Sequence, residues 1–455
     1  MRCSAPSSWA MKVLVNICRF VLATALIFSG YVKAVDPLGT QYKIGDYLGA
    51  VGLRDVVSDW LTLGASVALS ALEFCLGIFL LFAIHRRLVS RLTVVFMAVM
   101  TLVTLWLWIA NPITDCGCFG DAITLTNGQT LLKNIVLLAC AIIVARWPLC
   151  MVRFISESNQ WIVINYTVLF VLLSSVWSLY ALPLFDFRPY HIGANIPKGM
   201  EIPEGEKGPE FETTFILEKD GERREFSLDN YPDSTWTFVD SRTEQVSEGY
   251  VPPIHDFTIE RLDTGDDITD DVLADEGYTF LLIAPWIDKA SDTNFGEIDQ
   301  LYEYAHEHGY PFYCLTSSNE SAIDRWRELT GAEYTFCFTD ATTLKTIVRS
   351  NPGLVLLKNG TVIRKWSHNM LPVLEQEQMA MPLEEMEIGQ MPEDSVPQKI
   401  GVLLLWFVLP LFLLTLADRL WAWTKWLRRR KPVNEAVTEK KEDIITTPNN
   451  KKEKE

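Results

Sequence analysis

Residues 62–84 read TLGASVALSALEFCLGIFLLFAI, an apolar run in which Glu73 is the only charged side chain. A membrane-spanning α-helix needs about 20 predominantly apolar residues, so this run is long enough to cross a bilayer. Other runs of the same character lie on both sides of it. The predicted spans cover residues 12–33, 62–84, 91–110, 130–147, 161–183 and 400–420. The sequence therefore predicts a multi-pass protein embedded in a lipid bilayer.

The charge is divided unevenly along the chain. The whole sequence has 40 Lys and Arg against 57 Asp and Glu, a formal net charge of −17. Residues 186–399 alone hold about 42 acidic and about 17 basic residues, a net charge of roughly −25. A chain with this acidic balance would repel a phosphate backbone, which excludes nucleic acid as a partner.

The basic residues of the short connections set the expected orientation. They gather at residues 85–91, 146–153 and 425–431, which fall on alternate connections between spans. Cytoplasmic connections carry an excess of Lys and Arg. We therefore expect both termini in the cytoplasm and residues 186–399 outside, which for a bacterial inner membrane, the predicted location, is the periplasm.

The most informative short segment is Asp115-Cys116-Gly117-Cys118-Phe119-Gly120, in an outer connection between two spans. Two cysteines one residue apart can pair only where the backbone turns sharply, and Gly117 permits such a turn. The small ring would be strained and easily reduced, which suits Cys116 and Cys118 to thiol–disulfide exchange. The alternatives are an inert disulfide, two free thiols or half of a metal site. No metal site is predicted, because that connection has no His or further Cys to complete a ligand set.

Glu73 is the second candidate site residue. An ionisable side chain near mid-membrane costs several kcal/mol unless it is neutral or paired, so it marks a functional position by default. The alternative is a hydrogen bond between helices, with Gly77 allowing a close approach one turn further on.

Three segments of the first 150 residues together resemble a known family. They are residues 28–37 (FSGYVKAVDP), 72–77 (LEFCLG) and 116–120 (CGCFG). The series resembles the four-helix DoxX/MauE-type membrane proteins, in particular the fused form found in Bacteroidetes.

That resemblance implies a four-helix bundle and a set of site residues. Cys116 and Cys118 match the family's cysteine motif, while Glu73 and Lys33 match its polar positions, and Lys33 is carried over as a substrate-binding candidate. The MauE branch is associated with methylamine utilisation, where it is thought to aid processing of a disulfide-rich subunit. The DoxX branch is associated with a quinone-linked complex.

The acidic outer part is predicted to have two sections. The first is a β-rich lead-in with a hairpin around Asp220-Gly221. In the second, strands and helices alternate, which predicts an α/β domain with a mainly parallel sheet and an antiparallel end.

The end of that domain, residues 351–360 (NPGLVLLKNG), resembles a thioredoxin fold of the membrane-tethered, TlpA-like branch. The resemblance implies a cis-proline at Pro352 on a substrate-binding surface. The expected Cys-x-x-Cys is missing, because Ile287 and Ala290 occupy the two cysteine positions if Trp286 takes the place of the usual tryptophan. This thioredoxin-like domain is therefore degenerate and cannot run dithiol exchange by itself.

The predicted fold class is an α-helical membrane bundle, a four-helix DoxX/MauE-like unit plus two further spans, with an extracytoplasmic α/β thioredoxin-like domain. The expected segments are a leader (1–11), the four-helix domain (12–150), a fifth span (161–183), the β-rich lead-in (186–255), the thioredoxin-like domain (256–375), an acidic linker (376–399), a sixth span (400–420) and a basic, disordered cytoplasmic tail (421–455).

Three functions fit these observations. The first is an envelope redox-maturation factor, in which Cys116 and Cys118 exchange disulfides with a client protein or a redox partner protein. The second is a membrane scaffold or binding subunit without enzyme activity, in which the cysteine pair is only structural. The third is a subunit of a quinone-linked membrane oxidoreductase, in which Glu73 handles a proton. Quinone is the only cofactor that these hypotheses invoke.

Overall fold

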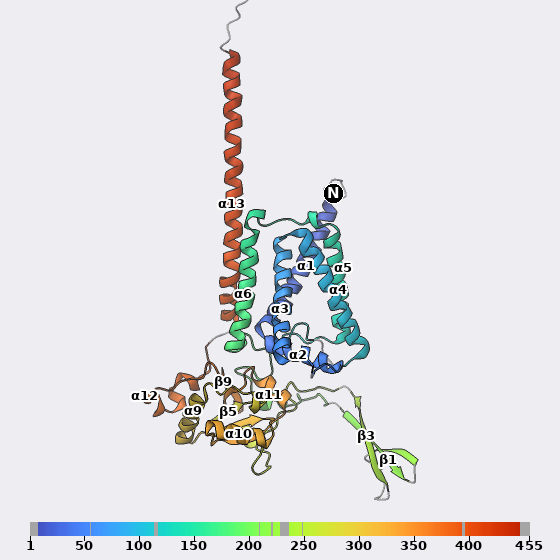
Figure 1. The fold of residues 1–455 in the computed structure, drawn as a ribbon, viewed down its shortest axis with the longest axis vertical. Helices are drawn as coiled ribbons and strands as arrows, with labels where there is room; N and C mark the ends of the chain where they lie inside the picture. The colour runs from blue at the N-terminus through green and yellow to red at the C-terminus, as the bar shows by residue number, and fades with distance from the viewer. Residues whose placement is uncertain are drawn as a thin grey trace, which may run out of the picture. The chain divides into compact units, whose positions relative to one another are not determined.

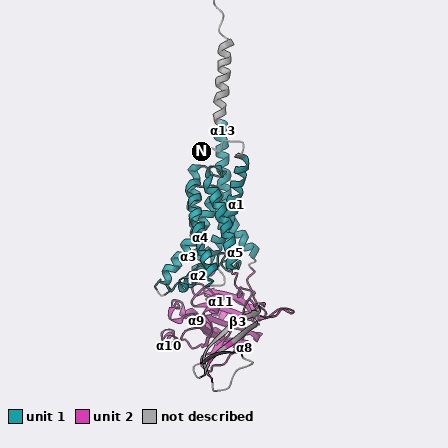
Figure 2. Ribbon diagram, turned by 90° about the vertical axis from the view of Figure 1, so that its right-hand side faces the viewer, with its two compact units in different colours: residues 1–179, 183–185, 394–455 teal, residues 180–182, 186–393 magenta. Residues whose placement is uncertain are grey.

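The computed structural model describes residues 8–54, 56–112, 117–208, 210–219, 222–227, 236–247, 249–393 and 396–445. The chain divides into two compact units, coloured separately in Figure 2. We call residues 1–179, 183–185 and 394–455 the membrane unit, and residues 180–182 and 186–393 the α/β unit.

Within the described residues, the membrane unit has six helices that are long and apolar enough to cross a membrane (Figure 1). They are α1 (Ser8–Val35), α3 (Asp59–Phe82), α4 (Arg86–Ala110), α5 (Asn127–Arg146), α6 (Gln160–Tyr180) and α13 (Val396–Ile445). Their number and order confirm the predicted spans, and the protein is a multi-pass membrane protein.

The C-terminal tail differs from its prediction. A basic tail from residue 421, disordered after Lys431, was expected, but α13 continues as a helix to Ile445. Residues 434–445 (NEAVTEKKEDII) are rich in Glu and Lys, which are good helix formers.

A buried arginine fixes one end of the contact between α1 and α3. Arg19 of α1 is fully buried, and its Nε donates to the carbonyl oxygen of Leu80 at 2.8 Å, with a further bond from Nη2 to the carbonyl of Leu81. These carbonyls lie in the last turn of α3, where a helix leaves its carbonyls unpaired and where a positive charge is favourable. Arg19 therefore caps α3 from a neighbouring helix.

The α/β unit is built on a six-stranded sheet in the order β4-β7-β6-β5-β8-β9. β5, β6 and β7 are parallel, whereas β8 and β9 are antiparallel and close one side of the sheet. This arrangement confirms the predicted α/β class. The strands are β4 (Glu260–Arg261), β5 (Tyr278–Ile283), β6 (Phe312–Thr316), β7 (Thr335–Phe338), β8 (Gly353–Lys358) and β9 (Thr361–Ser367).

The two faces of this sheet pack against different helices. Phe280 and Leu282 of β5 join α9 (Phe295–His308) and α10 (Glu320–Thr330) in one apolar cluster. Leu281 and Ile283 point to the other face, with α8 (Thr269–Ala274) and α11 (Ala341–Ile347). Successive strand residues face opposite sides, and both sides are covered, which explains why β5 is buried along its whole length.

The structure includes two further segments in the α/β unit, which differs from the predicted bounds. Residues 376–399 were expected to be a linker, but Leu383 and Met386 pack into the same cluster as α9, through α12 (Gln376–Met379), η5 (Leu383–Glu385) and η6 (Glu387–Gly389). Residues 186–255 were expected to precede the domain, but Tyr190 and Ile196, the first residue of α7 (Ile196–Met200), lie in the opposite cluster. The apolar residues in these polar segments are isolated. They show neither helical nor strand spacing, so the sequence pattern did not indicate that they are buried.

The rest of the lead-in forms a separate three-stranded sheet in the order β2-β1-β3. Its strands are β1 (Glu210–Lys219), β2 (Glu222–Ser227) and β3 (Thr237–Ser247), and β1 pairs antiparallel with both neighbours. The predicted hairpin is confirmed, while its turn at 220–221 lies outside the described residues.

Candidate functional site

Two glycines let α1 and α3 approach closely. A Cβ atom added to Gly30 would lie 2.4 Å from the backbone nitrogen of Phe74, and one added to Gly77 would lie 2.8 Å from the backbone nitrogen of Ile27. No side chain fits at either position without moving backbone. Small residues allow spanning helices to pack at such short range. The role expected for Gly77 is thus confirmed, and Gly30 supplies the matching position on α1.

The close approach brings the two polar positions of the bundle together. Lys33 Nζ lies 2.6 Å from Glu73 Oε2, and their side chains are only 5% and 7% exposed. Lys33 Nζ also donates to Ser29 Oγ at 3.1 Å. Each charge offsets the cost of burying the other, and removing either partner of a buried pair costs about 3–5 kcal/mol. Glu73 is therefore paired, as both sequence interpretations allowed.

The cysteine loop is attached to this ion pair. Ser29 Oγ donates to the carbonyl oxygen of Cys118 at 2.6 Å, so a chain of polar contacts runs from Glu73 through Lys33 and Ser29 to the loop backbone. Gly117 has a φ of 57°, in the left-handed region that glycine favours, which confirms the sharp turn expected there.

Aromatic contacts hold the residue after Cys118. The ring centroids of Phe119 and Phe28 of α1 lie 5.5 Å apart. Lys133 of α5 places Nζ 4.0 Å from the centroid of the Phe119 ring, a cation–π contact. The loop that carries Cys118 is thus fixed to both α1 and α5.

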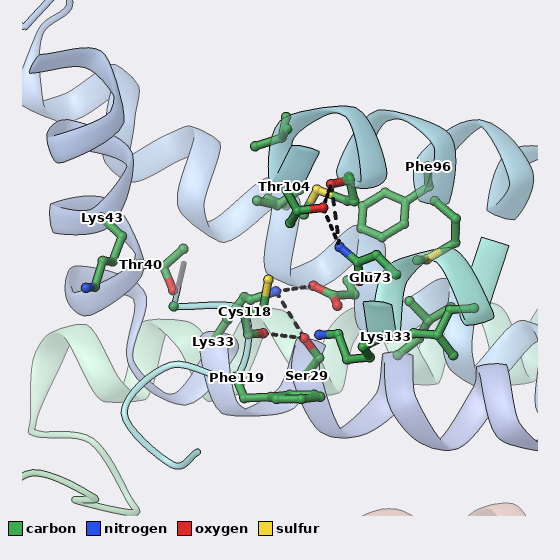
Figure 3. Close-up of a pocket in the computed structure, with 18 of the residues that line it drawn as sticks. Ser29, Lys33, Thr40, Lys43, Glu73, Phe96, Thr104, Cys118, Phe119 and Lys133 are labelled. Atoms are coloured by element: carbon green, nitrogen blue, oxygen red, sulfur yellow. Dashed lines mark hydrogen bonds and ion pairs between the residues drawn. The ribbon is translucent and has the colours of Figure 1, made fainter. Parts of the chain in front are cut away.

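The ion pair and the cysteine loop line one partly open cavity of about 80 Å³, shown in Figure 3. Ser29, Lys33, Glu73 and Cys118 all contribute to its wall. The structure therefore brings together three of the predicted site residues, namely Lys33, Glu73 and Cys118. Cys116, the other half of the predicted pair, lies outside the described residues.

A wall of the cavity comes from a helix that sequence reasoning missed. α2 (Pro37–Ala50) contributes Thr40, Lys43 and Tyr47. It begins at an N-cap, Asp36, whose side chain accepts from the backbone nitrogen of Gly39 at 2.9 Å. An Asp followed directly by Pro is a helix-start pattern, and it could have revealed α2.

A buried polar contact on α4 and α5 was missed as well. Asn134 Nδ2 donates to Thr104 Oγ1 at 3.3 Å, and both side chains are buried at the cavity wall. This contact joins the two helices opposite the ion pair.

The charged residues of the cavity wall are mostly cationic. They are Lys33, Lys43 and Lys133 against one carboxylate, Glu73, and among the described residues Lys33 alone is ion-paired with it. Positive charges near a thiol favour its reactive thiolate form, and sulfur exchange requires that form. The cavity wall thus combines Cys118 with a buried, structurally fixed ion pair. Cys75 instead packs in the apolar cluster of Phe74 and Phe407, which supports a packing role.

The α/β unit offers no comparable thiol site. The peptide bond before Pro352 is cis, as expected, but Pro352 is buried, so its ring is not an open contact surface. Cys314 and Cys337 are fully buried. Burial raises the pKa of both thiols, that of Cys337 to about 12, which keeps them protonated and unreactive.

Ile287 and Ala290, where a Cys-x-x-Cys was expected, lie in a short turn, η4 (Ile287–Lys289), and at its C-cap. Asn351 Nδ2 donates to the carbonyl of Trp286 at 2.8 Å, and the backbone nitrogen of Ser291 donates to the carbonyl of Asn351 at 3.0 Å. Backbone and amide contacts, rather than sulfur, therefore connect this turn to the proline loop.

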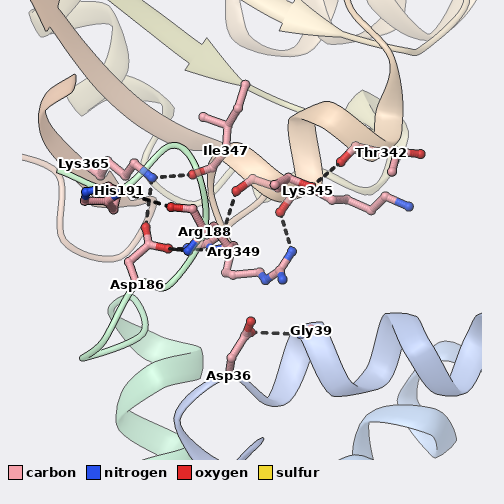
Figure 4. Close-up of polar contacts among 11 residues, drawn as sticks. Asp36, Gly39, Asp186, Arg188, His191, Thr342, Lys345, Ile347, Arg349 and Lys365 are labelled. Carbon is pink, nitrogen blue, oxygen red and sulfur yellow. Dashed lines mark hydrogen bonds and ion pairs between the residues drawn. The ribbon is translucent and has the colours of Figure 1, made fainter. Parts of the chain in front are cut away.

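A buried charge network in the α/β unit also escaped the sequence analysis (Figure 4). Asp186 contacts Arg188 Nε at 2.7 Å and Lys365 Nζ at 3.0 Å. Burial by itself raises the pKa of Asp186, but the charges of Lys365 and Arg188 outweigh it and lower the pKa to about 2. Burial lowers the pKa of Lys365 to about 8 against the opposing effect of Asp186. The network joins the start of the α/β unit to β9, which is a structural role.

Among the described residues, no group of three or more His, Cys, Asp or Glu side chains is placed to hold a metal ion. The fold and the cavity define a multi-pass membrane protein with a polar, cysteine-bearing site in a helical bundle and a separate α/β unit.

Comparison with known proteins adds a family to that class. Residues 11–146 match the model of the methylamine utilisation protein MauE family, so this part of the chain is MauE-like. The matched region contains Lys33, Glu73, Cys116 and Cys118. Residues 211–248 match a domain of unknown function (DUF8463).

The other comparisons add little. No curated protein matches the chain. One solved structure, of a candidate protein disulfide isomerase from Bacteroides thetaiotaomicron, is 16% identical and covers 28% of this chain and 79% of its own. Its TM-score of 0.21 is too low for this likeness to carry an argument.

Proposed function

We propose that this protein is a thiol–disulfide maturation factor of the bacterial cell envelope, embedded in the inner membrane. The active group is the pair Cys116 and Cys118. The observation that carries the proposal is the attachment of Cys118 to the buried Lys33–Glu73 pair through Ser29, at the wall of a cavity that Lys43 and Lys133 also line.

The proposed reaction moves two electrons from client to bundle. A client thiolate attacks one sulfur of the Cys116–Cys118 disulfide and breaks the S–S bond, forming a mixed disulfide. A second client thiolate then displaces the bundle sulfur, so the client gains a disulfide and the bundle gains two thiols. The lysines of the cavity wall stabilise the departing thiolate by charge.

The remaining parts of the proposal concern orientation and client. Both termini lie in the cytoplasm and the acidic α/β unit lies in the periplasm, because the basic connections alternate along the spans. The thioredoxin-like α/β unit is a degenerate fusion partner, of the kind found in Bacteroidetes, that docks a client or a redox partner without exchanging thiols. Residues 11–146 are MauE-like, and MauE is associated with methylamine utilisation. The disulfide-rich subunit of that system is therefore the first client to test.

Thiol trapping in intact cells tests the reaction. The wild-type chain is expected to show a redox-dependent mobility shift after alkylation with a membrane-impermeant maleimide reagent, and Cys118→Ser and Cys116→Ser should each abolish it. Each variant should also abolish client disulfide formation. Cys140→Ser is the matched control, since Cys140 packs in the apolar cluster of α1, α4 and α5.

Two results would overturn the proposal. One is unchanged client maturation in Cys118→Ser at normal protein abundance, which would favour the scaffold function. The other is maleimide access only after cells are opened, which would reverse the orientation.

A further inference from the structure

A second cavity of the membrane unit is larger than the first and differs in character. It has a volume of about 580 Å³, within the range of about 300–1,000 Å³ typical of small-molecule sites. It lies among α1, α3, α6 and α13, and its wall is almost entirely apolar. Wall residues such as Phe28, Leu404 and Phe412 are also exposed on the spanning helices. In a membrane such residues face lipid, so the cavity opens to the hydrocarbon phase.

One end of this cavity lies at the connection between α5 and α6. Phe154 of that connection lines the cavity beside Leu81 and Phe82 of the last turn of α3. The rings of Phe82 and Phe154 meet edge to face, with their centroids 6.4 Å apart. Thr415 is the wall residue of α13 nearest the C-terminus, and Arg419 follows it one turn later. The cavity therefore ends where the spans end, which in a bilayer is the level of the lipid headgroups.

Four arginines gather at this connection. They are Arg19 of α1, Arg86 of α4, Arg153 of the connection itself and Arg419 of α13. Arg19, Arg86 and Arg419 each donate to one of the carbonyl oxygens of residues 151–153. The guanidinium carbon of Arg19 also lies 4.9 Å from the centroid of the Phe154 ring, which lines the cavity. The fold thus concentrates positive charge at one end of an apolar space.

This positive charge is only partly offset. Among the described residues, the acidic side chains in contact with the connection are Glu157, 2.5 Å from Arg153, and Asp418, which accepts from the backbone nitrogen of Ser156 at 2.9 Å. Four cations therefore stand against two carboxylates. The Nε atoms of Arg86 and Arg153 are also buried without a hydrogen-bond acceptor in the described part of the chain. Buried donors without acceptors are costly, so this end of the cavity favours a ligand with anionic oxygens.

The arginines differ in what they offer such a ligand. Arg19 is fully buried, and its guanidinium nitrogens donate to backbone carbonyls of α3 and of the connection. In contrast, Arg419 is exposed and the Arg153 side chain is 36% exposed. Arg153 and Arg419 can therefore contact a headgroup, whereas Arg19 contributes charge from behind them.

We propose that the cavity among α1, α3, α6 and α13 binds an anionic phospholipid. Its acyl chain lies along the apolar wall, and its phosphate accepts from Arg153 and Arg419. The planar guanidinium groups of arginine match phosphate oxygens, and basic pockets between spanning helices bind anionic lipid headgroups. The site is independent of the thiol chemistry proposed above, so either proposal can fail while the other holds.

The lipid preference of the wild-type chain is the first test, and it requires no variant. The full-length protein in detergent is titrated with dioleoyl phosphatidylglycerol or with dioleoyl phosphatidylcholine, which has the same chains but no net charge. Native mass spectrometry measures the lipid bound. We expect saturable binding of phosphatidylglycerol, tighter than that of phosphatidylcholine by about tenfold or more. Equal affinities would overturn the proposal.

Charge variants test the headgroup contact. Arg153→Gln and Arg419→Gln should each weaken phosphatidylglycerol binding by about fivefold, equal to about 1 kcal/mol, and leave phosphatidylcholine binding unchanged. Arg91→Gln is the matched control, because Arg91 is exposed on α4, which contributes nothing to the cavity wall. If Arg91→Gln weakens binding as much as the other two, the effect is a general one of charge and the site is refuted.

A pair of neighbouring leucines tests the position of the acyl chain. Leu404 lines the cavity, whereas Leu405 is exposed on α13 outside its wall. Leu404→Trp puts an indole into the cavity and should weaken phosphatidylglycerol binding by about tenfold, while Leu405→Trp should bind normally. Equal binding by the two variants would show that the chain lies elsewhere.

Inorganic phosphate distinguishes a lipid from a free anion. Millimolar phosphate should not displace phosphatidylglycerol from the wild-type chain, because a free ion gains nothing from the apolar wall. Displacement would show that the arginines bind a phosphate group without its chains, and would overturn the assignment of the cavity to a lipid.

Discussion

The buried pair between Lys33 and Glu73 makes the sharpest prediction about the bundle. The perturbations are Glu73→Gln and Lys33→Met, each of which leaves the other partner buried and without its counter-charge. With side chains only 5% and 7% exposed and 2.6 Å between the charged atoms, the pair is shielded from water. Removing one partner of such a pair costs about 3–5 kcal/mol, which lowers the folded-to-unfolded ratio by about a hundredfold or more.

A double variant separates stability from function. Replacing both partners with apolar residues, as in Lys33→Met with Glu73→Leu, removes the cost of burying two charges and is expected to restore stability to near the wild-type value. It also removes the Lys33 contact to Ser29, so the cysteine loop loses part of its support. We therefore expect a stable double variant whose thiol exchange is slower than that of the wild type.

In the assay, increasing fractions of sodium dodecyl sulfate unfold the purified chain in mixed micelles. Tryptophan fluorescence reports the fraction unfolded. Ser29→Ala is the control, because it removes the loop bond and leaves the ion pair. It should cost only about 1 kcal/mol. If both single variants unfold at the wild-type midpoint, the charges are solvated and the reasoning is refuted.

Three further predictions concern packing, acid stability and thiol reactivity. Gly30→Ala should destabilise the bundle by about 1–3 kcal/mol, because its Cβ would meet Phe74 backbone, whereas Gly64→Ala, with nothing within 4 Å, should be neutral in the same assay. The folded-state pKa of Asp186 is lowered to about 2, so the stability that its charge contributes is complete above about pH 4 and is lost as pH falls toward 2. Near-UV circular dichroism should show this loss of stability. The loss should be smaller in Asp186→Asn. Cys314 and Cys337 should resist N-ethylmaleimide at pH 7.5 until the chain is denatured, as peptide mass spectrometry would show, and modification of the folded chain would contradict their burial.

The spans and most of the sheet could be predicted because each has a local signature. A spanning helix is a long apolar run, and α9 matches its predicted bounds at Phe295 and His308 because its apolar residues recur at helical spacing. The segment at 278–285 was recognised as a strand because it is short and continuously apolar, and β5 occupies Tyr278–Ile283. In these elements the residues that determine the structure lie within a few positions of each other.

The remaining features depend on contacts between distant residues. Asp186 and Lys365 are 179 positions apart, and nothing in either segment indicates the other. Arg19 occurs within an apolar run, but its partners are backbone carbonyls near the end of α3, which a sequence pattern does not reveal. The cavity at Cys118 was only partly foreseen for the same reason: its candidate residues were identified singly, and the fold brought Lys33, Glu73 and Cys118 to one wall.

Neighbouring residues at the crossing of α1 and α3 line different cavities, so one crossing shapes both. Ser29 and Glu73 line the cavity at Cys118, while Phe28 and Phe74 line the apolar one. Phe28 also packs on Phe119, which directly follows Cys118, so this contact helps to hold the cysteine loop. Phe28→Ala should therefore loosen the loop and slow a single round of client oxidation by the preformed disulfide. Equal rates of client oxidation in Phe28→Ala and the wild type, at normal protein abundance, would show that the contact does not position the loop.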